Sequence, residues 1–378
     1  MALEPIYEAD FLKCSYGFRP NRSTHDAMVA IRAWMVDGKR MYYVIEGDIK
    51  GYFDTIHHKK LMSLLRRRIA DKRILDLIWS FLKAGVMADG LLSATSQGTP
   101  QGGVISPLLA NVYLHELDMY FQKRFRDRTD WERAKCRAHG GNNAGYVRYA
   151  DDFVVLCNGH MQDVKQLKED IAAFLQDTLH LTLSETKTKI THGNDGFDFL
   201  GFRFYRGIAG DGKWKPKTAI PDSNIEVVKT KIRHLTEHDH TYMDEAAVVA
   251  QLNAVLRGWG NYYRYTPASR VFRTVDRFVF YRLLQWFVHK YKWSQSEVLR
   301  RRYSGDTGDR RLYAEWSARD GLRRVLLYAL TRDMKYKEYY PKKNGNPFLE
   351  NPTKPMNEIS EWRAGCGESR KSGSGEGA

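Results

Sequence analysis

The stretch that decides the fold reads Gly145-Tyr-Val-Arg-Tyr-Ala-Asp-Asp-Phe-Val-Val-Leu156. Runs of β-branched and aromatic residues lie on both sides of a short polar centre, and this pattern predicts two strands joined as a hairpin. The adjacent acids Asp151 and Asp152 fall at its tip. Two carboxylates are costly to bring together unless a cation lies between them. Oxygen donors with no His or Cys nearby favour Mg²⁺ over Zn²⁺, and an ordinary acidic turn is the alternative.

Composition indicates a basic globular protein with a polyanionic partner. The chain has 378 residues, with 60 Lys and Arg against 45 Asp and Glu, a net charge of +15 and a pI near 9.5. This length suits two or three domains, and the charge favours nucleic acid as the partner. No apolar run approaches the ~18 residues of a membrane span, so no membrane partner is expected. The cysteines form no Cys-x-x-Cys pair, which predicts no zinc, no disulfide framework and a reducing cytoplasm.

Two further segments combine polar residues with a predicted strand or turn. Residues 41–49 predict a strand that runs into Asp48-Ile-Lys-Gly-Tyr-Phe-Asp54, which places an acid at the end of a buried strand. Asp48 lies 103 residues before Asp151, so only a folded sheet can bring the two together. Residues 96–107 form a Gly-rich loop that leads into a helix, and its backbone amides can approach phosphates or a base pair. It lacks the Gly-Lys-Ser/Thr of a Walker A loop.

The pattern changes after a loop-rich stretch at residues 207–221, which we interpret as a linker. Residues 1–206 precede it, helical periodicity fills residues 222–300, and residues 301–378 form an extension with a disordered tail. Between residues 257 and 302 there are 11 Lys or Arg, two acids and 12 aromatic residues. Cations interleaved with aromatics on helices favour nucleic-acid binding, and a bundle with extended surface cations is the alternative.

These signals stand in an order that resembles a reverse transcriptase palm, most closely that of the bacterial group II intron reverse transcriptases, or maturases. The resemblance rests on three motifs and covers roughly residues 3 to 300: Gly98-Thr-Pro-Gln-Gly-Gly-Val-Ile-Ser-Pro-Leu-Leu-Ala-Asn111, Tyr149-Ala-Asp-Asp152 and Gly258-Trp-Gly-Asn-Tyr-Tyr-Arg-Tyr265. It implies an α+β fold, in which a right-hand polymerase palm with partial fingers precedes an all-helical thumb, or maturase, domain.

The resemblance also implies the site residues. Asp48, Asp151 and Asp152 are the implied catalytic acids, and with the Ile49 carbonyl they would hold two Mg²⁺ ions, for which Mn²⁺ can substitute. The implied nucleotide-binding residues are Phe53 beneath the sugar, Gln101 beside the nucleotide, Lys187 facing the pyrophosphate, and Arg19 and Arg22, which are equally well ordinary loop cations. The implied nucleic-acid-binding residues are Gly98, Pro100, Gly102, Phe199, Gly201, Arg257, Trp259, Tyr262, Tyr263 and Arg264.

The implied function is RNA-directed DNA synthesis linked to group II intron splicing and mobility in the bacterial cytoplasm. The implied partners are intron RNA, an RNA template, a DNA primer and deoxynucleoside triphosphates. Relatives carry a fingers segment ahead of the Leu3-Glu-Pro region, so we expect an N-terminally truncated chain that polymerises poorly. No His follows His289, so we expect no His-based endonuclease module. Two alternatives stay open, namely an RNA-binding maturase without polymerase activity and a domesticated reverse transcriptase in phage defence or repair.

Overall fold

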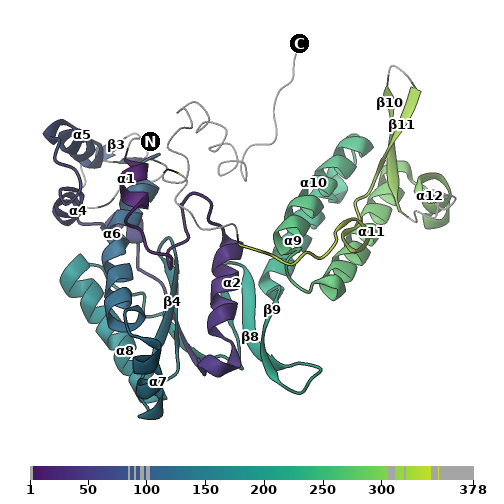
Figure 1. Ribbon diagram of the computed structural model, residues 1–378. Helices are drawn as coiled ribbons and strands as arrows, with labels where there is room; N and C mark the ends of the chain where they lie inside the picture. Colours follow the sequence, from purple (N-terminus) through teal and green to yellow (C-terminus); the bar gives the residue numbers. More distant parts are fainter. Residues whose placement is uncertain are drawn as a thin grey trace. The chain divides into compact units, whose positions relative to one another are not determined.

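The computed structural model describes residues 3–83, 86–88, 91–93, 98, 103–304, 311–318, 321–341 and 348. The chain divides into two compact units. The first unit comprises residues 1–197, 206–215 and 340–378, and the second comprises residues 198–205 and 216–339. Figure 1 shows the elements of both units coloured along the sequence.

The first unit is built on a four-stranded sheet in the order β4-β5-β1-β6. Its strands are β1 (Tyr43–Gly47), β4 (Ala144–Tyr149), β5 (Asp152–Cys157) and β6 (Lys189–His192). Strands β4 and β5 are antiparallel and pair Tyr149 with Asp152, which leaves Ala150 and Asp151 as the turn. The predicted hairpin is therefore confirmed, and so is the predicted strand that precedes Asp48. Strand β1 lies between β5 and β6 and is antiparallel to both.

Helices cover both faces of this sheet. Figure 1 shows α6 (Ser106–Phe121) and α8 (Met161–Phe174) on one side and α2 (Thr24–Trp34) on the other. Alternate residues of β5 point to opposite faces. Phe153, Val155 and Cys157 join the core formed with α6 and α8, whereas Val154 and Leu156 are buried outside that core.

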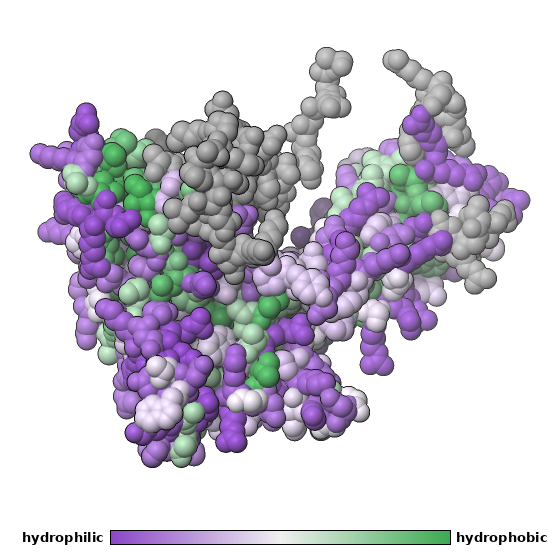
Figure 2. All heavy atoms as spheres, in the orientation of Figure 1, coloured by the Kyte–Doolittle hydropathy of each residue, from purple (hydrophilic) through white to green (hydrophobic). Residues whose placement is uncertain are grey.

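The remaining elements of the first unit are short helices and two short strands. They are α1 (Glu4–Glu8), η1 (Asp37–Lys39), α3 (Tyr52–Thr55), α4 (His58–Leu65), α5 (Lys72–Lys83), β2 (Val86–Ala88), β3 (Leu91–Ser93), η2 (Gln122–Arg126), α7 (Asp130–Ala138) and η3 (Leu175–Leu179). Helix α5 leaves Ile74, Leu77 and Phe81 exposed, and Figure 2 shows hydrophobic surface in that region, at the upper left. Within the described ranges, no helix combines the length and the apolar character that a membrane span requires.

The second unit is mainly helical. Its elements are α9 (Asp222–Leu235), η4 (His238–His240), α10 (Glu245–Tyr263), α11 (Ser269–Tyr291), α12 (Gln295–Arg302), β10 (Tyr313–Ala318), β11 (Gly321–Leu326) and α13 (Leu330–Asp333). Helix α9 packs on α10 and α11, and the β10–β11 hairpin packs on α10. The helices predicted for residues 222–300 are present, but the unit continues past residue 300, where the sequence predicted its end. The chain as a whole is α+β.

The stretch predicted as a linker is largely sheet. Strand β9 (Trp214–Ala219) lies within residues 207–221 and joins β7 (Phe197–Phe199) and β8 (Phe202–Ile208) in the order β7-β8-β9. Its sequence, Trp-Lys-Pro-Lys-Thr-Ala, lacks the alternation of apolar and polar residues that identifies a half-buried strand. The prediction was wrong because this strand buries little of its surface.

Candidate active site

Three carboxylates lie at the same end of the four-stranded sheet. Asp48 follows the last residue of β1, Asp151 lies in the hairpin turn, and Asp152 begins β5. Gly47 pairs with Phe153, so the antiparallel register places Asp48 opposite Asp152. A Cβ atom on Gly47 would lie 2.1 Å from the Phe153 ring, so only glycine allows this ring to lie across β1. The sheet thus joins acids that are far apart in the sequence.

Negative charge exceeds positive charge around these three acids. Burial raises the pKa of Asp151, and the neighbouring Asp48 adds to the rise. Burial together with the charges of Asp151 and Asp48 raises the pKa of Asp152 to about 6, although part of its side chain reaches solvent. Lys187 offsets this only in part, with its Nζ 3.2 Å from Asp48 Oδ1. A donor set made of carboxylate oxygens and short of positive charge fits divalent cations.

The backbone next to Asp48 supplies a further oxygen. Ile49 forms an isolated antiparallel bridge with Leu183. The hydrogen bonds of this bridge come from the flanking residues, from Lys50 N to Thr182 O at 3.0 Å and from Ser184 N to Asp48 O at 2.8 Å. In such a pair the backbone groups of the central residue point to the other edge of its strand. The Ile49 carbonyl therefore faces the side on which β5 and the hairpin turn lie.

A buried ion pair between Arg148 and Asp118 lies next to the hairpin turn and stabilises it. Arg148 and Asp118 are both fully buried, and Arg148 Nη2 lies 2.6 Å from Asp118 Oδ2. Arg148 Nη1 also donates to Asn111 Oδ1 and to the carbonyl of Ala150, both at 2.9 Å. Ala150 has a φ of +57°, a conformation that L residues rarely adopt unless their surroundings hold them there. Arg148 thus holds the turn that carries Asp151 against α6.

Gly17, in the loop before α2, also contacts the hairpin turn and α6. Asn111 Nδ2 donates to the carbonyl of Gly17 at 2.9 Å. A Cβ atom on Gly17 would lie 2.3 Å from the backbone nitrogen of Ala150, so the loop touches the hairpin turn directly. Residues 15–17 therefore lie along β4 beside the hairpin turn, where any larger side chain at position 17 would displace the turn.

Arg148, Asp118 and Asn111 were not predicted from the sequence to belong to the site. The available signal was an arginine inside the apolar strand between Val147 and Tyr149, together with Asp118 one residue after Leu117 in the apolar stripe of α6. Charged residues at such positions are almost always paired when they are buried. Their partners could not be assigned, because 30 residues separate Asp118 from Arg148.

The predicted nucleotide-binding residues have different placements. Phe53 is half-buried on α3 and packs against the core beside Tyr52. Gly98, with a φ of +95°, donates to Ile56 O at 2.9 Å and so lies against the end of α3. Lys187 is 70% exposed near Asp48. Gln101, Pro100 and Gly102 lie outside the described residues.

The two loop arginines are engaged in structural contacts. Arg19 is buried, its Nη2 lies 2.6 Å from Glu8 Oε1, and its Nη1 donates to two backbone carbonyls. Arg22 donates to the carbonyls of Lys13 and Ser15 and lies over the Tyr16 ring. The prediction that Arg19 contacts a nucleotide phosphate is wrong, because its charge is already neutralised inside the protein. Arg22 mainly stabilises the conformation of its own loop through these contacts.

In the second unit, the predicted nucleic-acid-binding aromatics hold a turn. Tyr262 donates to the Leu200 carbonyl at 2.7 Å, and Tyr263 donates to the Gly201 carbonyl at 3.1 Å. Asn224 from α9 also donates to Gly201 O, at 3.2 Å. Tyr263 is buried, and Tyr262 stacks on Phe202. These residues position the turn between β7 and β8.

The other predicted nucleic-acid-binding residues are only partly accessible. Arg257 is exposed and its guanidinium lies 5.3 Å from the centre of the Tyr328 ring. Trp259 and Arg264 are half-buried, and Phe199 is buried. Within this set, Arg257 therefore offers the most accessible positive charge, whereas the aromatic side chains mainly build the unit.

Residues 1–204 match the family described as reverse transcriptase (RNA-dependent DNA polymerase), and residues 225–304 match the group II intron, maturase-specific domain. The chain belongs to the reverse transcriptase family, and the predicted resemblance to its group II intron members is confirmed. The family uses divalent metal ions in general, in agreement with the donor set formed by the three acids.

Individual relatives support the same assignment. Protein YkfC of Escherichia coli (strain K12) is 43% identical over 238 residues, which cover 58% of this chain and 62% of that protein. Group II intron-encoded protein LtrA of Lactococcus lactis subsp. cremoris is 32% identical over 331 residues, which cover 69% of this chain and 54% of that protein. The chain thus spans 54% to 62% of the length of these two relatives. Among solved structures, apo telomerase from Candida tropicalis aligns with a TM-score of 0.41 at 12% identity, covering 79% of this chain and 50% of that chain.

Proposed function

We propose that this chain is an RNA-directed DNA polymerase of a group II intron that also binds intron RNA to assist splicing and retrohoming. The observation that carries the proposal is the meeting of Asp48, Asp151 and Asp152 at one sheet end in a member of the reverse transcriptase family. The match of residues 225–304 to the maturase-specific domain supports the intron as the RNA partner. The substrates would be an RNA template, a DNA primer and deoxynucleoside triphosphates.

The chemistry follows from the donor set. Asp48, Asp151 and the Ile49 carbonyl would hold two Mg²⁺ ions, with Asp152 beside them, and Mn²⁺ would substitute. When bound, such ions activate the primer 3′-hydroxyl and stabilise the leaving oxygen. A bond forms between the 3′ oxygen and the α-phosphorus, the bond from that phosphorus to the pyrophosphate oxygen breaks, and the hydroxyl proton leaves to solvent.

Other residues would bind and orient the substrates. Lys187 is exposed and close to Asp48, so its ammonium would face the negative charge of the leaving pyrophosphate. Phe53 lies five residues after Asp48 and would pack beneath the sugar. The turn at Leu200 and Gly201, held by three hydrogen bonds from α9 and α10, would contact nucleic acid.

Primer extension on an RNA template tests the proposal. The purified 378-residue chain should extend an annealed DNA primer in the presence of Mg²⁺ or Mn²⁺ and should stop when the metal is chelated. Binding of Mn²⁺, measured by electron paramagnetic resonance, gives a second readout that needs no turnover. A chain that binds neither Mn²⁺ nor primer–template would contradict the proposal.

A second candidate is an RNA-binding maturase that does not polymerise. It is favoured by the separate match of residues 225–304 to the maturase-specific domain. Primer extension distinguishes the two candidates, because only the first of them would extend a primer. A maturase without polymerase activity would promote splicing of a group II intron transcript to the same extent when Asp151 is replaced by Asn, and it would not extend a primer.

Phe53 should select deoxyribonucleotides. An aromatic ring beneath the sugar leaves no space for a 2′-hydroxyl, so Phe53→Ala should raise the efficiency ratio of ribonucleotide to deoxyribonucleotide incorporation, by at least roughly 10-fold for a steric discrimination of about 1.4 kcal/mol. The ratio is measured by single-nucleotide extension. Phe81→Ala on α5 is the control, since this aromatic is half exposed and lies outside the proposed site. A folded Phe53→Ala chain with an unchanged ratio would assign Phe53 to packing alone.

RNA binding should weaken steeply with salt. Each phosphate that the chain neutralises releases counterions, so log affinity should fall linearly with log salt, by about 0.7 per contact for single-stranded RNA. Arg257→Gln removes an exposed charge and should reduce that slope by about one contact. Lys165→Gln on α8, in the other unit, is the matched control. An affinity that does not depend on salt would contradict the electrostatic account.

A further inference from the structure

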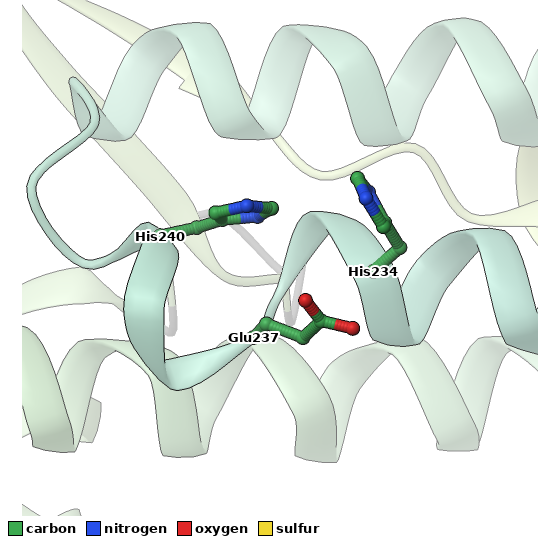
Figure 3. Close-up of side chains that lie close together, drawn as sticks. All are labelled: His234, Glu237 and His240. Carbon is green, nitrogen blue, oxygen red and sulfur yellow. The ribbon is translucent and has the colours of Figure 1, made fainter.

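A cluster of His and Glu side chains lies where α9 ends and η4 begins, in the second unit. His234 belongs to the last turn of α9, Glu237 precedes η4, and His240 ends η4. One potential ligand atom from each of the three residues lies within 4.8 Å of the other two. Figure 3 shows the two imidazoles and the carboxylate pointing toward a common space. The imidazole centres are 5.1 Å apart.

Helix α11 anchors the backbone on both sides of this cluster. Arg282 donates to the hydroxyl of Thr236 at 3.0 Å and to its carbonyl at 2.9 Å. Lys290 donates to the carbonyls of Thr241 and Met243 at 2.8 and 2.6 Å. These contacts hold residues 236–243 without using the side chains of the cluster. The three side chains are therefore presented by a fixed backbone, which is what a preorganised metal site requires.

The three side chains can bring their ligand atoms together around one metal ion. His240 Nδ1 is buried and has no hydrogen-bond partner in the described part of the chain, and such an unsatisfied atom costs free energy. His234 and Glu237 are exposed and can adjust their rotamers. Ligands at about 2.0–2.2 Å from a common metal lie roughly 3–3.5 Å apart. Since the ligand atoms lie within 4.8 Å of one another, they need to approach by at most about 1.3–1.8 Å.

We propose that His234, Glu237 and His240 form a binding site for one transition-metal ion of the Zn²⁺ type. Two imidazole nitrogens and one carboxylate suit Zn²⁺, Co²⁺ or Ni²⁺, whereas Mg²⁺ and Ca²⁺ prefer oxygen alone. The sequence prediction of no zinc considered paired cysteines, and this site uses none. It is independent of the proposed polymerase site, which lies in the other unit and consists of oxygen donors.

The ion would fasten one end of the α9–α10 hairpin. At the other end, Asn224 near the start of α9 and Tyr262 and Tyr263 at the end of α10 hold the turn at Leu200 and Gly201. A metal that binds the folded chain and not the unfolded chain stabilises the fold by mass action. The site would therefore stiffen the pair of helices that carries this turn.

Titration with Co²⁺ tests the site, because visible absorption reports the coordination of this ion. The full chain, without a polyhistidine tag, is titrated in excess Mg²⁺ so that the carboxylates of the first unit are occupied. We expect one Co²⁺ per chain. His234→Gln, Glu237→Gln and His240→Gln should each weaken binding by more than the roughly 10–100-fold that loss of an outer-shell partner costs. His238→Gln, in the same turn and outside the cluster, should bind as the wild type does.

Thermal unfolding supplies the second measurement. Zn²⁺ at about 100 times its dissociation constant should raise the melting temperature of the wild type and of His238→Gln by roughly 5 °C, and it should leave Glu237→Gln unchanged. Glu237 is exposed, so this variant folds whether or not the proposal is right. Co²⁺ binding that persists in all three cluster variants, or that shows a thiolate charge-transfer band, would overturn the proposal. So would the absence of a stoichiometric Co²⁺ site in the wild type.

Discussion

Asp48→Asn and Asp151→Asn should each abolish primer extension, with a loss of at least ~10³-fold, and should leave RNA affinity little changed. Each substitution removes one negative charge from the group that would hold the metal ions. Metal ions contribute several kcal/mol of charge stabilisation to the transition state, and each 1.36 kcal/mol corresponds to about a tenfold change in rate. In the proposed function RNA affinity comes from phosphate contacts elsewhere, which these substitutions do not touch.

The measurement combines single-turnover extension with Mn²⁺ binding and RNA binding on the same preparations. Glu169→Gln, an exposed residue of α8, removes the same charge from the same unit and is the matched control. Mn²⁺ affinity should fall in Asp48→Asn and Asp151→Asn and stay constant in the control. If both aspartate variants extended a primer at nearly the wild-type rate, the three acids would not be the catalytic centre.

Asp118→Ala should destabilise the protein by about 3–5 kcal/mol, because it leaves the fully buried guanidinium of Arg148 without its partner. Burial by itself disfavours a charged guanidinium, and Asp118 outweighs this, so the pKa of Arg148 is raised above its ordinary value. Removing Asp118 reverses that balance. The melting temperature should fall by roughly 10 °C or more.

Glu116→Ala is the control for this prediction. Glu116 lies on the same helix and pairs with Arg67, which is 59% exposed, so its loss should cost less than about 1 kcal/mol. The double variant Asp118→Leu/Arg148→Met should recover most of the stability, since apolar residues of similar volume replace a buried pair at little cost. It should not recover primer extension, because the Ala150 carbonyl, which belongs to the hairpin turn, then loses its hydrogen bond from Arg148. A double variant with full activity would show that Arg148 stabilises the fold without positioning the acids.

Local patterns were sufficient to predict the hairpin and the strand before Asp48, because β-branched and aromatic runs with a polar turn have few other solutions. The same patterns placed Asp48 at the end of a strand and Asp151 and Asp152 at a hairpin tip, but their catalytic role was implied by the family resemblance and stays a prediction. The partners of Arg19 and Tyr263 could not, because Glu8 and Gly201 lie 11 and 62 residues away and only the folded chain brings them close. Strand β9 was not predicted, because half of its residues are polar, little of its surface is buried, and its pairing depends on β8. Sequence periodicity reports burial, and it therefore misses elements that are held mainly by hydrogen bonds to a neighbour.

The turn at Leu200 and Gly201 has a consequence for recombination between relatives. Residues 198–205 belong to the same compact unit as residues 216–339, although residues 206–215 of the other unit separate them in the chain. A chimeric enzyme with a single crossover near Pro221 would take Tyr262, Tyr263 and Asn224 from one parent and the carbonyls they bind from the other. Four crossovers, one on each side of residues 198–205, one before Pro216 and one after Tyr339, would transfer the unit whole. Exchange of this unit among relatives is therefore constrained by a discontinuous boundary.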